Sequence, residues 1–182
     1  MRKVYVPLLL AFCLLLTGCA GSGAKSRYEE FARELSGKED FSFTGDIRAE
    51  YQDKTAEFTI EYIRDAEGCT VTVVEPELIR GVTAHMAEGK TQLEFSGVIL
   101  DVGPLDEYGL SPMTALPTLV RAMEEGHIES VRSEEGSLVF ELQPEDWLTV
   151  TVWFDEDNMR PVHAEIASGG RVAVYCELRD WS

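Results

Sequence analysis

Hydrophobic and polar residues alternate strictly along three successive segments in the first half of the chain. In residues 41–51 the apolar side is formed by the odd-numbered positions and the polar side by the even-numbered ones. The same alternation recurs in 55–62 and in 69–73. A period of two over three runs in a row is typical of an antiparallel meander with one apolar and one solvated face. The pattern therefore predicts a sheet whose apolar face must be covered by other parts of the chain, by a partner or by a lipid.

Shorter strands are predicted in the rest of the chain. A break at 75–81 is followed by two strands around the turn Ala87-Glu88-Gly89-Lys90 and by a short apolar strand, and the last third returns to strands separated by acidic or glycine-containing turns. With the meander this makes eleven predicted strands. The eight later ones are 82–86, 91–95, 98–102, 127–132, 137–142, 147–155, 160–167 and 171–179.

Helical spacing of apolar residues occurs at 26–35, before the meander. Its apolar residues stand at i, i+3, i+4 and i+7, from Tyr28 to Leu35. Ser26 and Glu29 fit a capping box, and Gly37 is placed to end the helix. A short helix with one apolar stripe is predicted to lie on the sheet and seal an edge or a face.

A second helical segment interrupts the strands just before Gly126. Leu116, Leu119, Val120 and Met123 repeat the helical spacing, and Pro117 is predicted near the first turn, where its missing N–H costs little. The sequence leaves two alternatives for this helix: it plugs an open sheet, or it is a crossover packed on the outside.

The first residues have the pattern of a bacterial export signal. Arg2 and Lys3 form a short basic region, and 7–16 is an apolar run of signal-peptide length. The run ends in Leu16-Thr17-Gly18-Cys19, which resembles the lipobox of bacterial lipoproteins, in which the cysteine is acylated and becomes the new N-terminus. The resemblance predicts that Cys19 carries acyl chains such as palmitate. The alternative is an ordinary secretory signal with a chance cysteine.

These signals divide the chain into a lipoprotein signal peptide (1–18), a lipidated cysteine with a flexible leash (19–24) and a single domain (25–182). Two or three acyl chains hold a protein durably on a membrane. Ala20, not aspartate, follows the cysteine. In a two-membrane bacterium this resembles a lipoprotein exported to the outer membrane; in a one-membrane bacterium the protein stays on the outer face of the cell membrane.

The domain is strongly acidic. Loss of Arg2 and Lys3 leaves fourteen basic residues against 33 acidic ones, so the net charge changes from −17 for the whole chain to −19. Nucleic acid and anionic headgroups repel such a surface, which predicts no nucleic-acid partner. Membrane attachment must then come from the anchor.

Two short motifs accompany the order of predicted elements. Pro76-Glu77-x-x-x-Gly81 breaks the chain after the third strand, and Trp153-Phe154-Asp155-x-x-x-Met159-Arg160-Pro161 joins two late strands. Together with the meander and the interrupting helix, they resemble the LolA/LolB-like lipoprotein carriers over most of 41–181. The resemblance implies a mainly β fold with two short helices: a curved antiparallel sheet that forms an unclosed β-barrel with a helical plug and holds acyl chains. LolA itself is soluble, so the predicted anchor makes this chain closer to LolB or to anchored, GerS-like lipoproteins.

Motifs of catalysis are missing from the sequence. It contains no Gly-x-Ser-x-Gly, no His-Glu-x-x-His, no glycine-rich phosphate loop and no Cys-x-x-Cys. His85, His127 and His163 are scattered singly, and the acidic turn 155–158 lacks the spacing of an EF-hand loop. The sequence therefore predicts no catalytic residues, no metal site and no cofactor.

Cys69 and Cys176 are the cysteines of the predicted domain, and both fall on the apolar side of their strands. An extracytoplasmic compartment permits a disulfide, and two buried thiols are the other alternative, which the sequence slightly favours.

Two functions follow from these observations. In the first, which the sequence favours, the concave face stays partly unfilled and binds an acyl chain of a lipid or lipoprotein. In the second, the face is filled, and the domain is a non-enzymatic scaffold that binds another envelope protein or a second copy, for example through an open sheet edge. The predicted ligand-lining residues lie on the apolar side of the meander and on the second helix: Phe43, Ile47, Phe58, Ile60, Val71, Leu116, Leu119, Val120 and Met123.

Overall fold

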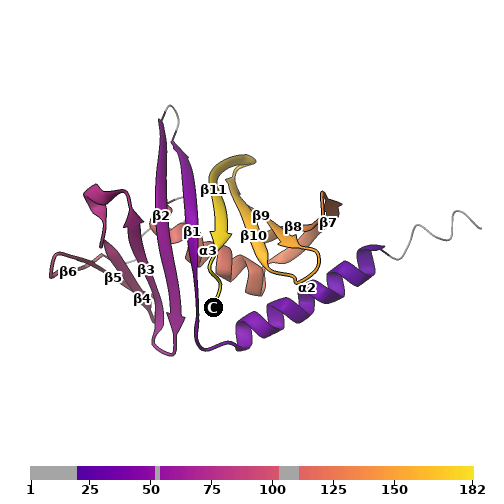
Figure 1. The fold of residues 1–182 in the computed structure, drawn as a ribbon, viewed down its shortest axis with the longest axis horizontal. Helices are drawn as coiled ribbons and strands as arrows, with labels where there is room; N and C mark the ends of the chain where they lie inside the picture. Colours follow the sequence, from indigo (N-terminus) through magenta and orange to yellow (C-terminus); the bar gives the residue numbers. More distant parts are fainter. Residues whose placement is uncertain (1–19, 52–53, 103–110) are drawn as a thin grey trace, which may run out of the picture.

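Eleven antiparallel strands form one sheet in this computed structural model, which describes residues 20–51, 54–102 and 111–182 (Figure 1). The strand order is β6-β5-β4-β3-β2-β1-β11-β10-β9-β8-β7, so only the β1–β11 pair joins strands that are not consecutive in the chain. In chain order the elements are α2 (Ala20–Gly37), β1 (Phe41–Tyr51), β2 (Lys54–Asp65), β3 (Gly68–Glu75), the 3-10 helix η1 (Glu77–Ile79), β4 (Thr83–Ala87), β5 (Lys90–Phe95), β6 (Val98–Asp101), α3 (Pro112–Glu125), β7 (His127–Glu134), β8 (Ser137–Glu145), β9 (Leu148–Asp155), β10 (Pro161–Ser168) and β11 (Arg171–Arg179).

The sheet is curved but not closed. Its two outermost strands, β6 and β7, do not pair with each other, and the first strand pairs with the last over Thr44–Ala49 and Val174–Arg179. The β1–β11 pair therefore joins an N-terminal half of six strands to a C-terminal half of five. This arrangement confirms the predicted fold class, an unclosed antiparallel barrel with a helical part.

The helix α3 packs inside the curve of the sheet. It contacts β1, β2 and β3 from one half and β8 and β10 from the other, so the sheet bends around it (Figure 1). Eight of its residues are buried. Of the two alternatives for this helix, the structure shows the plug.

The predicted alternation sets which side chains reach the interior. In β9, Leu148, Val150, Val152 and Phe154 are fully buried, and the residues between them are half-buried. On β1 and β2 the same side of the sheet buries Phe43, Ile47 and Ile60. Because successive side chains of a strand point to opposite faces, one run of alternating residues fixes the inner face along the whole strand.

The helix α2 lies across the C-terminal half and contacts α3 and β7. Tyr28 and Leu35 are buried, as predicted, and the Tyr28 ring packs on those of Phe140 and Phe154 with centroids 4.6 and 5.8 Å away. The helix begins earlier than predicted, at Ala20, so residues 20–24 are helical and not a flexible leash, and Ser26 is inside the helix, not its cap. Ala24 belongs to the hydrophobic core. This tertiary contact stabilises helical residues that the sequence alone does not predict.

The start of α3 also differs from the prediction. Ser111 caps the helix by accepting a hydrogen bond from the Met113 N–H, and Pro112 occupies its first position. Pro117 is therefore inside the helix, where it lacks the N–H that would donate to the Met113 carbonyl. The prediction that Pro117 lies near the first turn was wrong because the Ser-Pro start was assigned to the preceding loop.

Some predictions fall outside the described residues. These are the signal peptide, Cys19 and the part of the predicted loop at 103–110. Among the helices of the described segments, none has the length and apolar character needed to cross a bilayer.

Candidate functional site

The nine predicted lining residues come together in one interior between the meander and α3. Ile60, Val71, Leu116, Leu119 and Met123 are fully buried; Phe43, Ile47 and Val120 are between 1 and 3% exposed. Phe58 alone is half-buried, at the margin of this core. Since a side chain with no exposed surface touches no water-sized space, the protein's own atoms fill the interior around the first five. Their role in lining a ligand stays a prediction.

Gly45 shows how closely α3 approaches the sheet. A Cβ added at this glycine would lie 2.8 Å from Leu116 Cδ2 and 3.2 Å from its Cδ1. The absence of a side chain on β1 leaves the space that the Leu116 side chain fills. The strand and the helix are therefore in direct contact at the centre of the concave face.

Arg64 holds the C-terminal end of α3 in place. From β2 its guanidinium donates to Glu124 Oε1 at 2.6 Å and to the carbonyl oxygens of Leu35 and Lys38 at 2.6 and 3.0 Å, and it lies 4.4 Å from the centroid of the Phe41 ring. The side chains of Arg64 and Glu124 are 18 and 16% exposed. One partly buried cation thus joins β2, α3 and the end of α2.

A second polar contact joins the two helices. The Tyr28 hydroxyl donates to the Met123 carbonyl oxygen at 2.9 Å, and burial raises the pKa of this phenol above its usual value. The Met123 carbonyl lies in the last turn of α3, where the helix itself supplies no donor. This bond and the Arg64 contacts together hold the C-terminal end of α3 in place.

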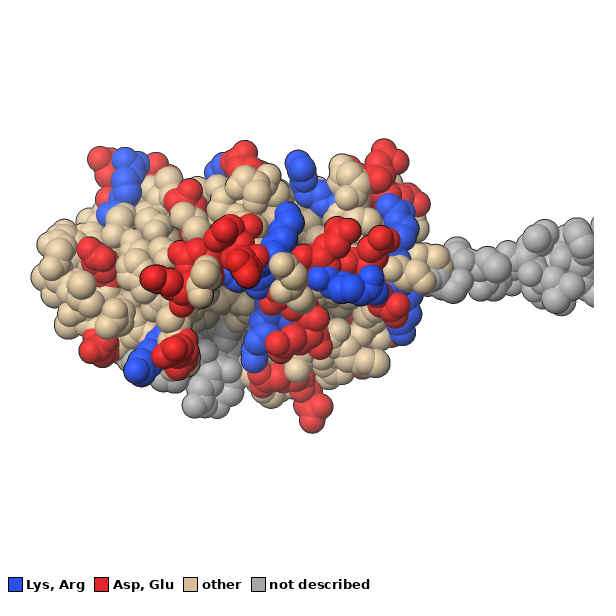
Figure 2. All heavy atoms as spheres, turned by 90° about the horizontal axis from the view of Figure 1, so that it is seen from below, with Lys and Arg blue, Asp and Glu red and all other residues tan. Residues whose placement is uncertain are grey.

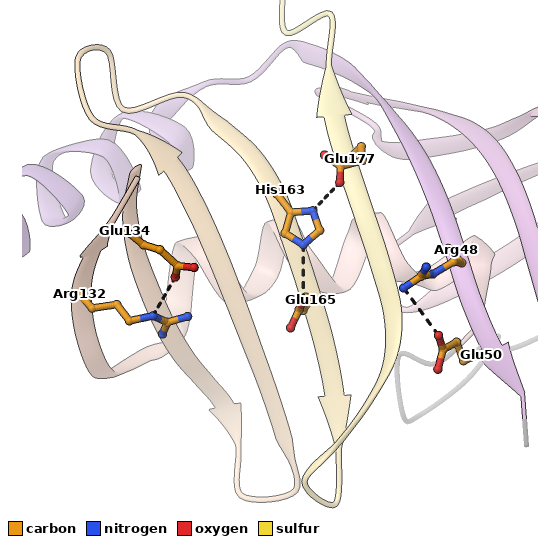
Figure 3. Close-up of polar contacts among 7 residues, drawn as sticks. All are labelled: Arg48, Glu50, Arg132, Glu134, His163, Glu165 and Glu177. Atoms are coloured by element: carbon orange, nitrogen blue, oxygen red, sulfur yellow. Dashed lines mark hydrogen bonds and ion pairs between the residues drawn. The ribbon is translucent and has the colours of Figure 1, made fainter. Parts of the chain in front are cut away.

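The opposite face of the sheet is polar. His163 lies between Glu177 on β11, with Nδ1 2.9 Å from Oε1, and Glu165 on its own strand, with Nε2 3.6 Å from Oε1 (Figure 3). Arg48 with Glu50 and Arg132 with Glu134 form further pairs on this face (Figure 3). Within the described residues, no three His, Cys, Asp or Glu side chains are grouped so that they could hold a metal ion.

Cys69 and Cys176 are free thiols. They lie on β3 and β11, which β2 and β1 separate in the sheet, so about three strand spacings of about 4.8 Å keep them beyond the reach of a disulfide. Burial raises the pKa of Cys69, and it raises that of the fully buried Cys176 to about 12. The structure therefore has the two separate thiols that the sequence slightly favoured.

An apolar sheet edge is a feature that was not predicted from the sequence. On β6, Val98, Ile99 and Leu100 are 59, 59 and 57% exposed, and Phe95 and Val102 beside them are 45 and 38% exposed. The end of the molecule that carries β4 to β6 shows a broad surface with few charged side chains (Figure 2). Leu138-Val139-Phe140 on β8 is a similar apolar run and is buried. The signal at this edge was the unbroken apolar run Val98-Ile99-Leu100. It predicted only a short strand.

No family model and no curated protein sequence matches this chain. Solved structures do. An uncharacterized conserved protein from Thermus thermophilus is 8% identical, with 87% of this chain and 86% of that chain covered and a TM-score of 0.52. The LolA superfamily protein NE2245 from Nitrosomonas europaea is 15% identical, with 87 and 92% covered and a TM-score of 0.48. A chain of the complex between the CwlD amidase and the GerS lipoprotein from Clostridioides difficile is 14% identical, with 87 and 91% covered and a TM-score of 0.42.

The chain is similar to solved structures that include a LolA superfamily protein, as the resemblance seen in the sequence led us to expect. At these identities the likeness concerns the fold alone.

Proposed function

We propose that this chain is a membrane-anchored lipoprotein on the extracytoplasmic side, held by acyl chains on Cys19, and that it works by binding another envelope protein and not by catalysis. The observation that carries the proposal is the burial of the residues predicted to line the concave face. Five of the nine predicted lining residues are fully buried by the protein's own atoms, and α3 occupies the place that a ligand would take.

The exposed apolar residues on β6 support the same function. A cluster of large apolar side chains that stays exposed on an otherwise acidic domain is typical of an interaction site. We therefore rank the protein-binding scaffold above the acyl-chain carrier, which the sequence alone favours.

Native mass spectrometry of the full chain, released from membranes in mild detergent, tests the proposal. We expect the mass of the chain with its covalent acyl groups, together with a complex with a second protein. Additional non-covalent lipid on the monomer, without a protein partner, would contradict the scaffold role.

For the anchor, Cys19→Ser should abolish incorporation of labelled palmitate and release the protein from membranes.

An acyl-chain carrier is the second candidate. It is favoured by the apolar lining on both sides of the α3–sheet contact, because acyl chains could replace these side chains if α3 moved away. In that case Phe58→Glu, at the margin of the core, should leave the fold intact and remove bound lipid. Ile60→Glu is expected to unfold the domain under either function, because Ile60 is fully buried.

A further inference from the structure

We infer that the free edge of β6 is the docking site for the partner, and that an extended segment of another envelope protein, rich in alternating basic and apolar residues, adds there as a further strand. The inference deepens the proposed function, since it names the surface and the chemistry of the partner. It starts from a difference between the two outer strands of the sheet.

The β7 edge carries the features by which proteins protect an open sheet edge. Its pairing with β8 has an irregularity between Ile128 and Ser130, Arg132 and Glu134 form an ion pair along it, and α2 lies against it. The β6 edge is short and ends in Asp101, but within the described residues it pairs regularly with β5, no ion pair runs along it, and three of its four residues are large and apolar.

The register shows which backbone groups β6 offers. Phe95 pairs with Val98 around the two-residue turn Ser96-Gly97, in which both residues have positive φ, 52° and 79°. Such a turn closes on a hydrogen-bonded pair, so the N–H and C=O of Val98 and Leu100 face β5. Those of Ile99 and Asp101 therefore project from the free edge, as a strand to be added would require.

The charge of the domain favours a basic partner. The whole chain carries −17, and Asp101 and Glu94 place carboxylates beside the apolar side chains of this edge. A segment that alternates apolar and basic residues would pack its apolar side on Val98 and Leu100 or on Ile99, and its charges would be attracted by the acidic surface.

The position of the edge argues against the membrane as its occupant. The N-terminal end of α2, from which the chain continues toward Cys19, lies at one end of the molecule and β6 at the other (Figure 1). A second copy fits poorly as well, because it would bring the same negative charge.

Amide hydrogen exchange of the full chain in neutral phosphatidylcholine nanodiscs tests the inference. The probe is a short synthetic peptide of alternating lysine and valine, and the control peptide alternates glutamate and valine. We expect the Ile99 and Asp101 amides to exchange rapidly in the free protein and to be protected by the lysine peptide alone.

Two variants at one position separate the backbone from the side chain. Ile99→Pro removes an outward N–H at an edge position where proline is tolerated, and Ile99→Ala trims the side chain but keeps the N–H. The proline variant should bind the lysine peptide about tenfold more weakly than the alanine variant, since it loses a backbone hydrogen bond. Slow exchange of the Leu93 and Leu100 amides reports that the β5–β6 hairpin is intact. If Ile99→Pro abolishes this slow exchange, Ile99→Lys serves instead, and its added positive charge should repel the lysine peptide.

Several results would overturn the inference. They are lack of protection by the lysine peptide, equal protection by the glutamate peptide, protection of these amides by the nanodisc lipid alone, and a dimer that Ile99→Pro abolishes. If a protein partner is retained by the Ile99→Pro chain in native mass spectrometry, the docking site is wrong and the proposed function stands. If lipid and no protein accompanies the wild-type chain, the proposed function itself fails.

Discussion

Gly45 is the residue at which strand and plug meet most closely. Its role depends on the space that it leaves and not on backbone freedom, since the contact with Leu116 is what a Cβ would disturb. Nothing in the alternation of β1 marks this position, because glycine there simply continues the apolar side. The sequence could predict which side Gly45 faces but not which residue fills the space beside it, since Leu116 lies some seventy positions away.

Gly45→Ala should lower the free energy of unfolding by about 1–3 kcal/mol, because the new methyl group overpacks the contact with Leu116. Urea denaturation measures the change. Gly37→Ala is the matched control, since a Cβ there meets nothing within 4 Å, and it should be neutral or slightly stabilising. The double variant Gly45→Ala, Leu116→Val should recover part of the loss; strict additivity would contradict the proposed contact.

The two thiols should be inert in the folded protein. Burial raises the pKa of Cys69 and brings that of Cys176 to about 12, so very little of either is thiolate near pH 8. A maleimide reagent should label Cys176 only in denaturant and Cys69 slowly without it, as mass spectrometry of timed samples can show. Rapid labelling of Cys176 in buffer would mean that the interior opens often.

At the scale of elements, Arg64 is the side chain of the sheet that binds the C-terminal end of α3. Arg64→Ala should destabilise the protein by about 2 kcal/mol, since it removes charge-assisted bonds to Glu124 and to two carbonyl oxygens at the end of α2. Chemical denaturation measures the loss. Arg121→Ala is the control on the same helix: its pair with Glu145 is about half exposed and should contribute less than about 1 kcal/mol. Equal losses in the two variants would contradict the role of Arg64.

Whether a segment is a helix or a strand was predictable where its apolar residues keep a single period over many positions. All eleven strands were predicted, most of them from alternation over five or more residues, which secondary structures other than a strand rarely produce. Helix starts were predicted less well. Residues 20–24 are small and carry no periodic signal, and the start of α3 depends on a Ser-Pro pair that is equally typical of a loop.

The whole molecule is held together by the pairing of β1 with β11. Asp46 and Arg179 strengthen it on the outer face, with Arg179 Nε 3.0 Å from Asp46 Oδ2. The hydrogen bond from Arg179 is the main cause that lowers the pKa of Asp46; the Thr59 hydroxyl, 2.7 Å from Oδ1, lowers it further, and burial opposes both.

A pH dependence follows from this shift. A carboxyl whose pKa is lower in the folded state stabilises that state above its unfolded pKa of about 4, and the contribution is lost as the pH falls through the folded value. Asp46→Asn should therefore lower stability by less than about 1 kcal/mol at pH 7, since the pair is nearly half exposed. The difference from wild type should vanish in thermal melts at pH 2–3. A constant difference across this range would exclude the ion pair as its cause.

The order of strands and the contents of the interior could not be predicted from local pattern alone. The unclosed sheet was predicted through a resemblance, and the β1–β11 pair joins residues more than a hundred positions apart. The predicted lining residues are together in the structure, yet whether they enclose space depends on side-chain packing around Leu116 and Leu119, which periodicity does not describe. The exposed β6 edge was missed because exposure, unlike alternation, depends on what the rest of the chain leaves uncovered.

The β1–β11 pair also has a consequence for biogenesis. The N-terminal strands cannot complete their sheet until β11, more than a hundred residues further along the chain, has been synthesised. Until then β1 keeps an unpaired edge, so folding of the whole domain must wait for its C-terminal half.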